Sequence, residues 1–342
     1  MKWRLLLLPF AWLYGIGVAL RNLLYNIGVF STYDPPVKTI NVGNLSVGGT
    51  GKTPHVEWIA NHLLQKKTSV AILSRGYGRE TKGYFEVAAN DNSIKVGDEP
   101  LQYKRKYKDE LTVHVSESRK KGVINILENH QVDVILLDDA FQHRAINTGL
   151  NIIITPFYQP FFRDYLLPAG DLREHRSGIK RADLVIVSKC PTGITDSEKL
   201  RMKNSIKLNS DKVFFSSISY KNMINETGNL DSPLKNVLLV TGIGNATGLY
   251  ETLDKTHEVT HMCYADHHQF SKKDMLDIEQ KFDTFADDNK FILTTEKDYS
   301  RLDDLIDKKE PTSPWYFIPI EVRVDEEERL KNILNNYVGT NS

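Results

Sequence analysis

One short segment of the chain has the residue types of a phosphate-binding loop. Residues 43–54 read GNLSVGGTGKTP and follow the short apolar run VKTINV. A strand that leads through a glycine-rich turn into a helix directs several backbone N–H groups and the positive end of the helix dipole at one point, which favours an anion. In such a loop Lys52 reaches the β- and γ-phosphates of a nucleotide, and the Thr53 hydroxyl binds Mg²⁺.

The loop departs from the general G-x-x-x-x-G-K-[ST] pattern at one position, where Ser46 replaces the first glycine. The double glycine that follows still lets the backbone curl round a phosphate group. A chance glycine turn is the alternative interpretation, but a strand before the loop and a helix after it are what phosphate binding requires. The residues predicted to bind the nucleotide are Ser46, Val47, Gly48, Gly49, Thr50, Gly51, Lys52 and Thr53.

Two adjacent acids end a second apolar run, VDVILLDDAFQH. Enzymes with a phosphate-binding loop need a carboxylate at a neighbouring strand end to hold magnesium, directly or through water. Buried acids are costly unless a cation or hydrogen-bond donors lie near them. We therefore predict that Asp138 and Asp139, with Thr53, form a Mg²⁺ site; the alternative is that they only cap a turn.

The nucleotide is predicted to be ATP. GTPases read guanine with an N/T-K-x-D motif after a strand, and here Ser188 and Lys189 stand in a suitable place but Pro191 replaces the aspartate. A similar tetrapeptide, TEKD at 295–298, falls in a later part of the chain.

These motifs lie at the ends of a series of nearly continuous apolar runs separated by helical patterns. Strands buried on both faces and alternating with helices are typical of a doubly wound, mostly parallel sheet. The fold class predicted is therefore α/β, of the kind found in phosphate-binding-loop NTPases. The runs expected to be strands are 37–42, 69–74, 111–116, 132–139, 151–156 and 182–189.

The pattern changes after residue 212, which predicts a division into lobes. We expect a first lobe that carries the phosphate-binding loop over 31–212 and a smaller second α/β lobe over 221–314. Residues 213–220 and 315–322 are expected to form a two-stranded connection between them. The last segment, 323–342, reads as a helix that packs back on the first lobe.

The N-terminus, residues 1–30, is predicted to be a hydrophobic and amphipathic helix. Residues 5–20 contain no charged side chain, but as a helix they would span only about 24 Å, less than the roughly 30 Å hydrocarbon core of a bilayer. Tryptophan and tyrosine side chains suit the headgroup level. We expect the helix to lie on a membrane surface; packing on the domain, dimerisation and a true span are the alternatives.

Composition restricts the partners. The chain of 342 residues has 44 basic and 44 acidic side chains, so its net charge gives no reason to expect a nucleic acid. Nothing in the sequence predicts a protein partner.

Taken together, the motifs resemble one known family. GNLSVGGTGKTP, SRGYGR, VGDEP, DDAFQH, PAGDLRE, DHH and TEKD follow one another in this order behind an apolar N-terminal helix, over about residues 5–300. This series closely resembles the tetraacyldisaccharide 4'-kinases of lipid A biosynthesis. Two positions depart from the family pattern: Ala140, where we expect glycine, and Asp171, where proline is more usual.

The resemblance implies a function and a location. Its members are membrane-associated kinases that move the γ-phosphate of ATP to the 4'-hydroxyl of a lipid A disaccharide 1-phosphate precursor. Their two α/β/α lobes close over the nucleotide. For this chain the resemblance implies ATP and Mg²⁺ at the loop, a lipid disaccharide acceptor, and a place on the cytoplasmic face of the inner membrane.

The resemblance also assigns catalytic roles. It implies that Asp98, in VGDEP, takes the proton of the acceptor hydroxyl, although a GDEP tetrapeptide alone more often caps a helix. Closure of the lobes would bring a histidine of the DHH motif to Asp98 and form a carboxylate–imidazole dyad. We choose His267 over His268 for this role and count Lys52 with the catalytic residues.

An acceptor that carries a phosphate and a sugar requires basic and aromatic side chains in loops at strand ends. The residues predicted to bind it are Arg75, Tyr77, Arg119, His143 and Arg173. The sequence assigns no role to residues 296–298.

Other interpretations remain open on the sequence alone. The HMCYADHH segment contains several zinc-ligand types. A GTPase or metallochaperone would use the same loop, but it predicts a guanine-reading aspartate where Pro191 stands. A membrane-bound nucleotide-binding regulator would leave Asp98 and DHH without a role, and a soluble sugar kinase would leave residues 5–30 without one.

Overall fold

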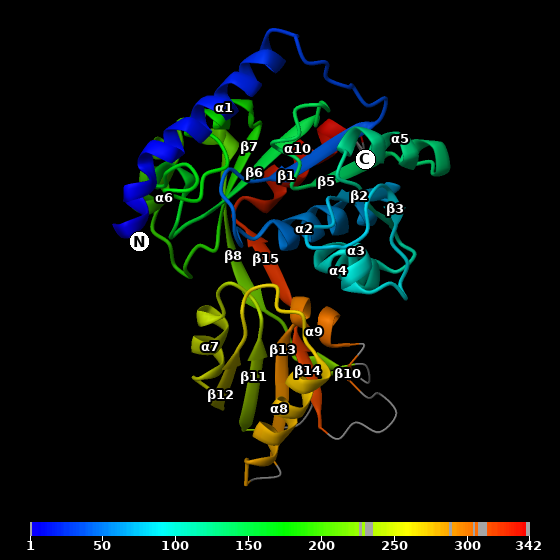
Figure 1. Ribbon diagram of the computed structural model, residues 1–342, viewed down its shortest axis with the longest axis vertical. Coiled ribbons are helices and arrows are strands. Elements are labelled where there is room, and N and C mark those ends of the chain that lie inside the picture. The colour runs from blue at the N-terminus through cyan, green and yellow to red at the C-terminus, as the bar shows by residue number, and fades with distance from the viewer. Residues whose placement is uncertain are drawn as a thin grey trace.

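The computed structural model describes residues 2–225, 228–229, 235–286, 289–303, 305–306 and 313–339. The chain forms two lobes, one above the other in Figure 1, each built on its own twisted sheet with helices on both faces. The predicted α/β class, the doubly wound and mostly parallel main sheet, the smaller second α/β lobe and the N-terminal apolar helix are confirmed.

The first lobe contains a nine-stranded sheet in which seven neighbouring strands, from β8 to β4, are parallel. An antiparallel strand closes each edge. Its strands, in order across the sheet, are β15 (Ile320–Val324), β8 (Val213–Tyr220), β7 (Leu184–Ser188), β6 (Leu150–Pro156), β1 (Lys38–Gly43), β5 (Val134–Asp138), β2 (Val70–Ser74), β4 (Thr112–Val115) and β3 (Phe85–Glu86). Because β1 lies between β5 and β6, the loop after β1 opens beside the ends of both, which is where ligands bind in doubly wound sheets.

Helices cover both faces of this sheet because the central strands are apolar on both sides. On one face pack α2 (Lys52–Gln65), α4 (Asp98–Tyr107) and α10 (Glu327–Val338), and on the other α5 (Arg119–Asn129) and α6 (Asp196–Ile206). The shorter helical segments of the lobe are α3 (Ser93–Val96), η2 (Phe161–Arg163), η3 (Arg176–Arg181) and η4 (Ser210–Lys212).

The second lobe has a six-stranded sheet of mixed direction. Its order is β10 (Gly228–Asn229), β9 (Ile224–Asn225), β14 (Trp315–Ile318), β13 (Lys290–Thr295), β11 (Asn236–Thr241) and β12 (Glu258–Cys263), and the last four are parallel. The helices α8 (Lys272–Asp283) and α9 (Glu296–Leu302) cover one face, and α7 (Thr247–Leu253) covers the other.

Two antiparallel strands, β8 and β15, run from one lobe to the other (Figure 1). The connection differs from the expected one in its second strand. Residues 315–322 do not form one strand: β14 belongs to the second sheet, and β15 begins at Ile320 and pairs with β8. The break comes at Pro319, which has no backbone N–H to continue a sheet ladder.

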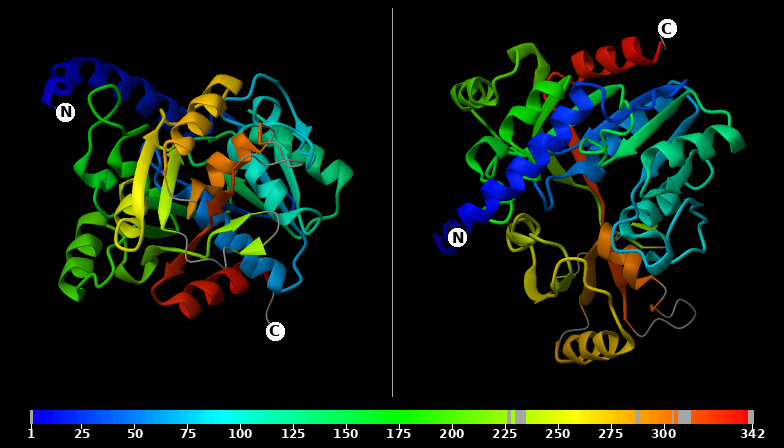
Figure 2. Two further views of the ribbon diagram at one scale, coloured as in Figure 1. Left: turned by 90° about the horizontal axis from the view of Figure 1, so that it is seen from below. Right: turned by 45° about the horizontal axis from the view of Figure 1, so that its top comes forward.

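The N-terminal segment is helical from η1 (Lys2–Leu7) through α1 (Leu8–Asn26) and lies along the outside of the first lobe, as Figure 2 shows. Trp3–Asn26 is long and apolar enough to cross a membrane, which the uncharged run 5–20 alone is not. One face of the helix packs on the lobe, where Ala11 is buried, while Trp12, Ile16 and Leu20 point outwards.

Polar side chains tie the inner face of this helix to the lobe at intervals along its whole length. The Arg4 guanidinium pairs with Asp171 at 3.0 Å, Tyr14 donates to the carbonyl of Arg173 at 2.8 Å, and Arg21 donates to the carbonyl of Gln142 at 2.9 Å. The departure from the family pattern at Asp171 thus has a partner in this chain's own N-terminal helix.

The C-terminal helix α10 packs on the first lobe through its apolar face, beside α2 and the edge strand β15. Leu330 and Leu334 are fully buried in the main core, and the Tyr337 hydroxyl donates to the carbonyl of Thr39 at 2.9 Å. The predicted helix 323–342 is therefore shorter, 327–338, and residues 340–342 lie outside the described part of the chain.

Truncation of this contact gives a test of the fold. We expect Leu334→Ala to lower the free energy of unfolding by about 2–5 kcal/mol, because it removes a fully buried side chain and leaves a cavity. The measurement is urea unfolding followed by circular dichroism. Asn332→Ala on the exposed face of the same helix is the matched control and should change stability by less than about 0.5 kcal/mol. Equal stability of the two variants would contradict the packing described here.

Candidate active site

The glycine-rich loop connects β1 to α2 in the geometry that an anion site requires. Gly48 and Gly51 have φ angles of 96° and 91°, in the left-handed region that favours glycine. Gly51 caps α2 without a side-chain hydrogen bond, so the first N–H groups of that helix are left to a ligand. Inside the loop, Asn44 Nδ2 donates to Thr50 Oγ1 at 3.0 Å and fixes its width.

The strand β7 supports this loop from the side. Ser188 Oγ donates to the carbonyl of Thr50 at 2.7 Å, and Lys189 Nζ donates to the carbonyl of Gly49 at 2.7 Å. Lys189 adopts a left-handed φ of 56°, which is uncommon for a residue other than glycine. The two residues that resembled part of a guanine-reading motif therefore brace the phosphate-binding loop.

The two acids at the end of β5 lie beside the loop but in different surroundings. Lys52 Nζ is 3.7 Å from Asp139 Oδ2, and Arg173 Nη1 donates to both Asp139 oxygens at 2.8 Å. Asp138 instead accepts from Ser74 Oγ at 3.1 Å. Asp139 has a left-handed φ of 52°, which turns the chain sharply after the strand.

The different surroundings move the pKa values of the two carboxyl groups in opposite directions. Burial raises the pKa of Asp138 to about 6, with Lys52 acting against the shift and Asp139 reinforcing it. Burial also acts to raise the pKa of Asp139, but Lys52 and Arg173 outweigh it and hold that pKa below its ordinary value. At neutral pH both carboxyl groups are therefore mainly ionised and place negative charge next to Lys52.

The buried Arg119 holds this strand end in place. Its guanidinium is 1% exposed and donates to the carbonyls of Ser116 at 2.7 Å and Asp138 at 2.9 Å. Because its guanidinium donates to backbone carbonyls, Arg119 holds the turn at Asp138–Asp139 in place. Arg173, likewise, is directed at Asp139. The structure thus turns these two predicted acceptor-binding residues toward the β5 turn.

The predicted dyad is formed across the two lobes. Asp98 begins α4 and is 3% exposed, and its Oδ2 lies 3.0 Å from His267 Nδ1 of the second lobe. His267 reaches it from a left-handed backbone conformation with a φ of 58°. His268 faces its own lobe, where its ring stacks on Tyr264 with centroids 4.7 Å apart. Of the two candidates, His267 is the one that meets Asp98.

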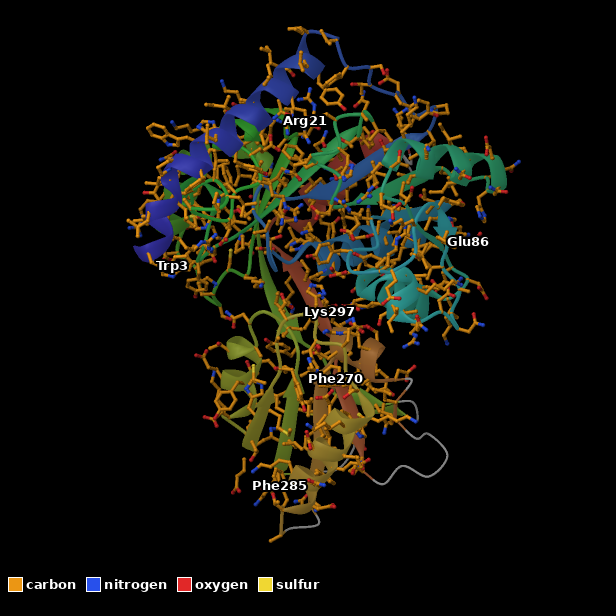
Figure 3. The ribbon with its side chains drawn as sticks, viewed as in Figure 1. Trp3, Arg21, Glu86, Phe270, Phe285 and Lys297 are labelled. Carbon is orange, nitrogen blue, oxygen red and sulfur yellow. The ribbon has the colours of Figure 1, made fainter. Side chains whose placement is uncertain are left out.

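Residues of the TEKD motif complete the junction, and Figure 3 shows Lys297 where the lobes meet. Lys297 Nζ donates to Glu99 Oε1 at 2.8 Å and lies 3.3 Å from His267 Nε2. Burial acts to raise the pKa of Glu99, but Lys297 outweighs it and the pKa is lowered. The sequence assigned this motif no role, and only its position at the end of an apolar strand could have indicated a site.

Arg301, one turn after Lys297 in α9, holds the loop that contains His267 and His268. Its guanidinium donates to the carbonyls of His268 at 2.9 Å and Gly242 at 3.0 Å and pairs with Asp298. Its Nε lies 3.7 Å from Asp98 Oδ2. The dyad is therefore held between a buried cation and the lysine of the same helix.

A second link joins the helix after the phosphate-binding loop to the second lobe. Lys106 Nζ pairs with Glu57 of α2 at 2.6 Å and with Glu296 of α9 at 3.1 Å. Burial raises the pKa of Glu57 to about 7, with Lys106 acting against that shift and Glu296 adding to it. Helices α2 and α4 of the first lobe and α9 of the second thus share one network of charges.

Of the remaining predicted acceptor residues, Arg75 and Tyr77 lie in the loop after β2, and His143 lies in the turn after β5. Arg75 and Tyr77 line an open cavity of about 570 Å³ with Glu117, and the Tyr77 ring lies 5.8 Å from that of His267. Burial, and then the charges of Arg119 and Arg75, lower the pKa of His143 to about 4. Tyr77 therefore lies beside the dyad, and His143 lies near the charges of Arg75 and the β5 acid Asp139.

Comparison with known proteins agrees with this geometry. The sequence profile of the family described as tetraacyldisaccharide-1-P 4'-kinase matches residues 3–339. A tetraacyldisaccharide 4'-kinase of Parabacteroides distasonis is 40% identical, with 99% of this chain and 96% of the relative covered. One from Phocaeicola vulgatus is 38% identical, with 100% and 96% covered.

A solved structure is similar over nearly its whole length. The crystal structure of LpxK from Aquifex aeolicus in complex with ATP superposes with a TM-score of 0.78 at 29% identity, and covers 98% of this chain and 99% of that one. The GTPase and regulator interpretations are not favoured by these relatives. The chain belongs to the tetraacyldisaccharide-1-P 4'-kinase family, the ATP-dependent kinases that phosphorylate the 4'-hydroxyl of a lipid A precursor.

Proposed function

We propose that this kinase carries out its reaction in the space between the phosphate-binding loop and the Asp98–His267 pair. The acceptor is a tetraacyldisaccharide 1-phosphate, and the loop residues 46–53 hold ATP. The observation that carries the proposal is the 3.0 Å contact of His267 Nδ1 with Asp98, which joins the second lobe to the start of α4 in the first. Phosphoryl transfer needs little beyond positioning, charge neutralisation and a proton acceptor, and this space supplies all three.

The loop and the β5 acids act on the phosphate chain. Backbone N–H groups at the start of α2 bind phosphate oxygens, and Lys52 neutralises charge on the β- and γ-phosphates. Thr53, Asp138 and Asp139 offer only oxygen ligands, a donor set that fits Mg²⁺. These three residues would hold the ion, which supplies neutralisation of the charge on the transferred group.

Asp98 takes the proton from the acceptor hydroxyl while the hydroxyl oxygen bonds to the γ-phosphorus. The bond between the γ-phosphorus and ADP breaks, and ADP leaves. His267 orients the Asp98 carboxylate, and Lys297 in turn fixes the imidazole from its other nitrogen at 3.3 Å. Glu99 holds Lys297 in place. Removal of Lys297 should therefore loosen the dyad rather than the ATP site.

The acceptor enters from the side of Arg75 and Tyr77. Arg75 neutralises phosphate charge, Tyr77 packs against a sugar ring, and the neutral His143 donates or accepts one hydrogen bond. Arg119 and Arg173 act by fixing the Asp138–Asp139 turn, in view of the partners given above. They are positioning residues in this proposal.

The acyl chains remain in the membrane, and α1 lies flat on its cytoplasmic face, where ATP is supplied. The support is the distribution of contacts: Arg4, Tyr14 and Arg21 bind the lobe at both ends and the middle of the helix, so a span would have to break them. The outward side chains form an apolar face suited to the interfacial layer.

We expect Asp98→Asn to lower kcat by a factor of about 10²–10⁴ while the Kd for ATP changes less than threefold, because the amide keeps the shape but accepts no proton. The measurement is transfer of labelled γ-phosphate to detergent-dispersed lipid, with ATP binding measured by calorimetry. Asp109→Asn, at the exposed end beyond the same helix, is the control and should retain full activity. A kcat within threefold of wild type for Asp98→Asn would rule out the proton-acceptor role.

The raised pKa of Asp138 predicts a pH-dependent requirement for magnesium. Below about pH 6 this carboxyl group is protonated and binds a cation poorly; above it the group is ionised. The Mg²⁺ concentration for half-maximal rate should therefore rise up to about tenfold per pH unit as pH falls below 6. Asp138→Asn should need more Mg²⁺ at every pH and lose this dependence. A requirement that does not change between pH 7.5 and 5 would speak against Asp138 as a ligand.

The apolar face of α1 can be tested separately from catalysis. We expect the combined variant Leu13→Ser, Ile16→Ser, Leu20→Ser to bind anionic lipid vesicles at least about a hundredfold more weakly, since each side chain contributes roughly 1.5 kcal/mol or more on burial. Co-sedimentation measures binding. Leu200→Ser with Leu276→Ser, two exposed leucines on other elements, is the control. Activity in detergent should be kept, and undiminished vesicle binding would exclude this face as the membrane contact.

A further inference from the structure

Three side chains with metal-binding groups meet on the first lobe, apart from the active site. Glu86 of β3, His114 of β4 and His130 at the C-terminal end of α5 each offer a ligand atom within 4.8 Å of the other two. In Figure 3 Glu86 lies on the outer flank of the upper lobe, while Lys297 marks the junction. Neither the kinase reaction nor the acceptor site described above uses this group.

The backbone brings these residues together. Glu86 and His114 are direct cross-strand partners in the antiparallel β3–β4 pair, so their side chains leave the same face of the sheet. The end of α5 adds His130, whose Nε2 lies 3.0 Å from Glu86 Oε2. The rings of His114 and His130 have centroids 5.1 Å apart at an angle of 61°.

These distances suit a tetrahedral ion. Zinc binds histidine nitrogen and carboxylate oxygen at about 2.0–2.2 Å, which places neighbouring ligand atoms roughly 3.3 Å apart. The Glu86–His130 separation is already near this value, and the ligand atom of His114 lies within 4.8 Å of both. Glu86 is exposed and His130 partly so, which leaves room for water as a fourth ligand.

The surroundings of His114 match those of a ligand histidine. The ring is fully buried, with its Nδ1 3.0 Å from the Tyr84 hydroxyl and its Nε2 2.9 Å from Thr112 Oγ1. Metal-binding histidines commonly use one nitrogen for the ion while a hydrogen bond to the other fixes the ring. Here one hydroxyl would give way to the ion and the other would remain as that orienting partner.

We propose that Glu86, His114 and His130 bind one zinc ion or a similar divalent transition metal, with water in the fourth position. The ion joins the edge strand β3 to the end of α5. It thereby anchors the segment between β2 and α4, which carries Tyr77 and leads directly into Asp98. The site is structural, and the two nitrogens with one carboxylate favour zinc over magnesium or calcium. The sequence drew attention instead to the ligand types in residues 261–268.

The test uses the full chain, treated with chelator and titrated with Zn²⁺ without nucleotide by calorimetry. Co²⁺ serves as the second probe, since tetrahedral coordination gives it a strong visible absorption. We expect one ion per chain and a Tm raised by a few degrees with Zn²⁺. His130→Ala and Glu86→Gln, both at accessible positions, should weaken binding at least on the order of tenfold to a hundredfold.

The matched control is His257→Ala, a partly exposed histidine of the second lobe, which should bind the ion as wild type does. Two results would overturn the proposal: no binding with a Kd below about 100 μM, or binding that His130→Ala and Glu86→Gln leave unchanged. In either case Glu86 and His130 form only a surface hydrogen bond. His114 is fully buried, so His114→Ala would disturb the core as well as the site. Circular dichroism of His130→Ala and Glu86→Gln verifies that these two variants fold.

Discussion

The first lobe is organised around the need to keep two adjacent carboxylates at the end of a buried strand. Charge buried in this way is unfavourable unless cations and donors surround it. Asp139 receives Lys52 from the phosphate-binding loop and Arg173 from the long loop after β6, while the buried Arg119 holds the carbonyl of Asp138. The phosphate-binding loop, the end of β5 and the loop that carries Arg173 therefore have fixed positions before any ligand binds. Phosphoryl transfer depends on preorganisation of this kind.

The contact between the lobes is made largely by charged side chains, unlike the cores of the two lobes, which are apolar. Lys297 meets Glu99, and Lys106 bridges Glu57 and Glu296, so helix α4 of the first lobe and α9 of the second are joined by ion pairs. The side chains of these pairs are largely buried, so each charge depends on its partner for compensation. Separation of the lobes would return these charges to water, whereas the paired strands β8 and β15 keep the lobes connected.

Sequence reasoning reached the parts of the site whose function depends on local order. The loop from Gly43 to Pro54 and the acids after β5 are recognisable because neighbouring residues act together, whereas the role expected of Asp98 came from the family resemblance, since GDEP alone more often caps a helix. It did not reach Lys297, or the position of Arg119 inside the lobe, because their partners are distant in sequence and are set by packing. The division of 315–322 into β14 and β15 was missed although Pro319 marks it in the sequence: both halves are apolar, and the pairing across the sheets shows that they belong to different lobes.

The N-terminal helix and the Asp138–Asp139 turn are joined through one short segment, residues 173–174, which would link the proposed membrane contact to the geometry of the site. Tyr14 donates to the carbonyl of Arg173, the residue whose side chain holds both oxygens of Asp139. One residue further, Glu174 is buried and accepts from Asn22 of the helix and from Gln142 after the turn. With α1 at the membrane interface, as proposed above, this connection would fix the height of the acids above the membrane. A lipid acceptor whose chains stay in the bilayer could present its hydroxyl only within a narrow range of depths, so the connection would match the depth of the site to that of the substrate.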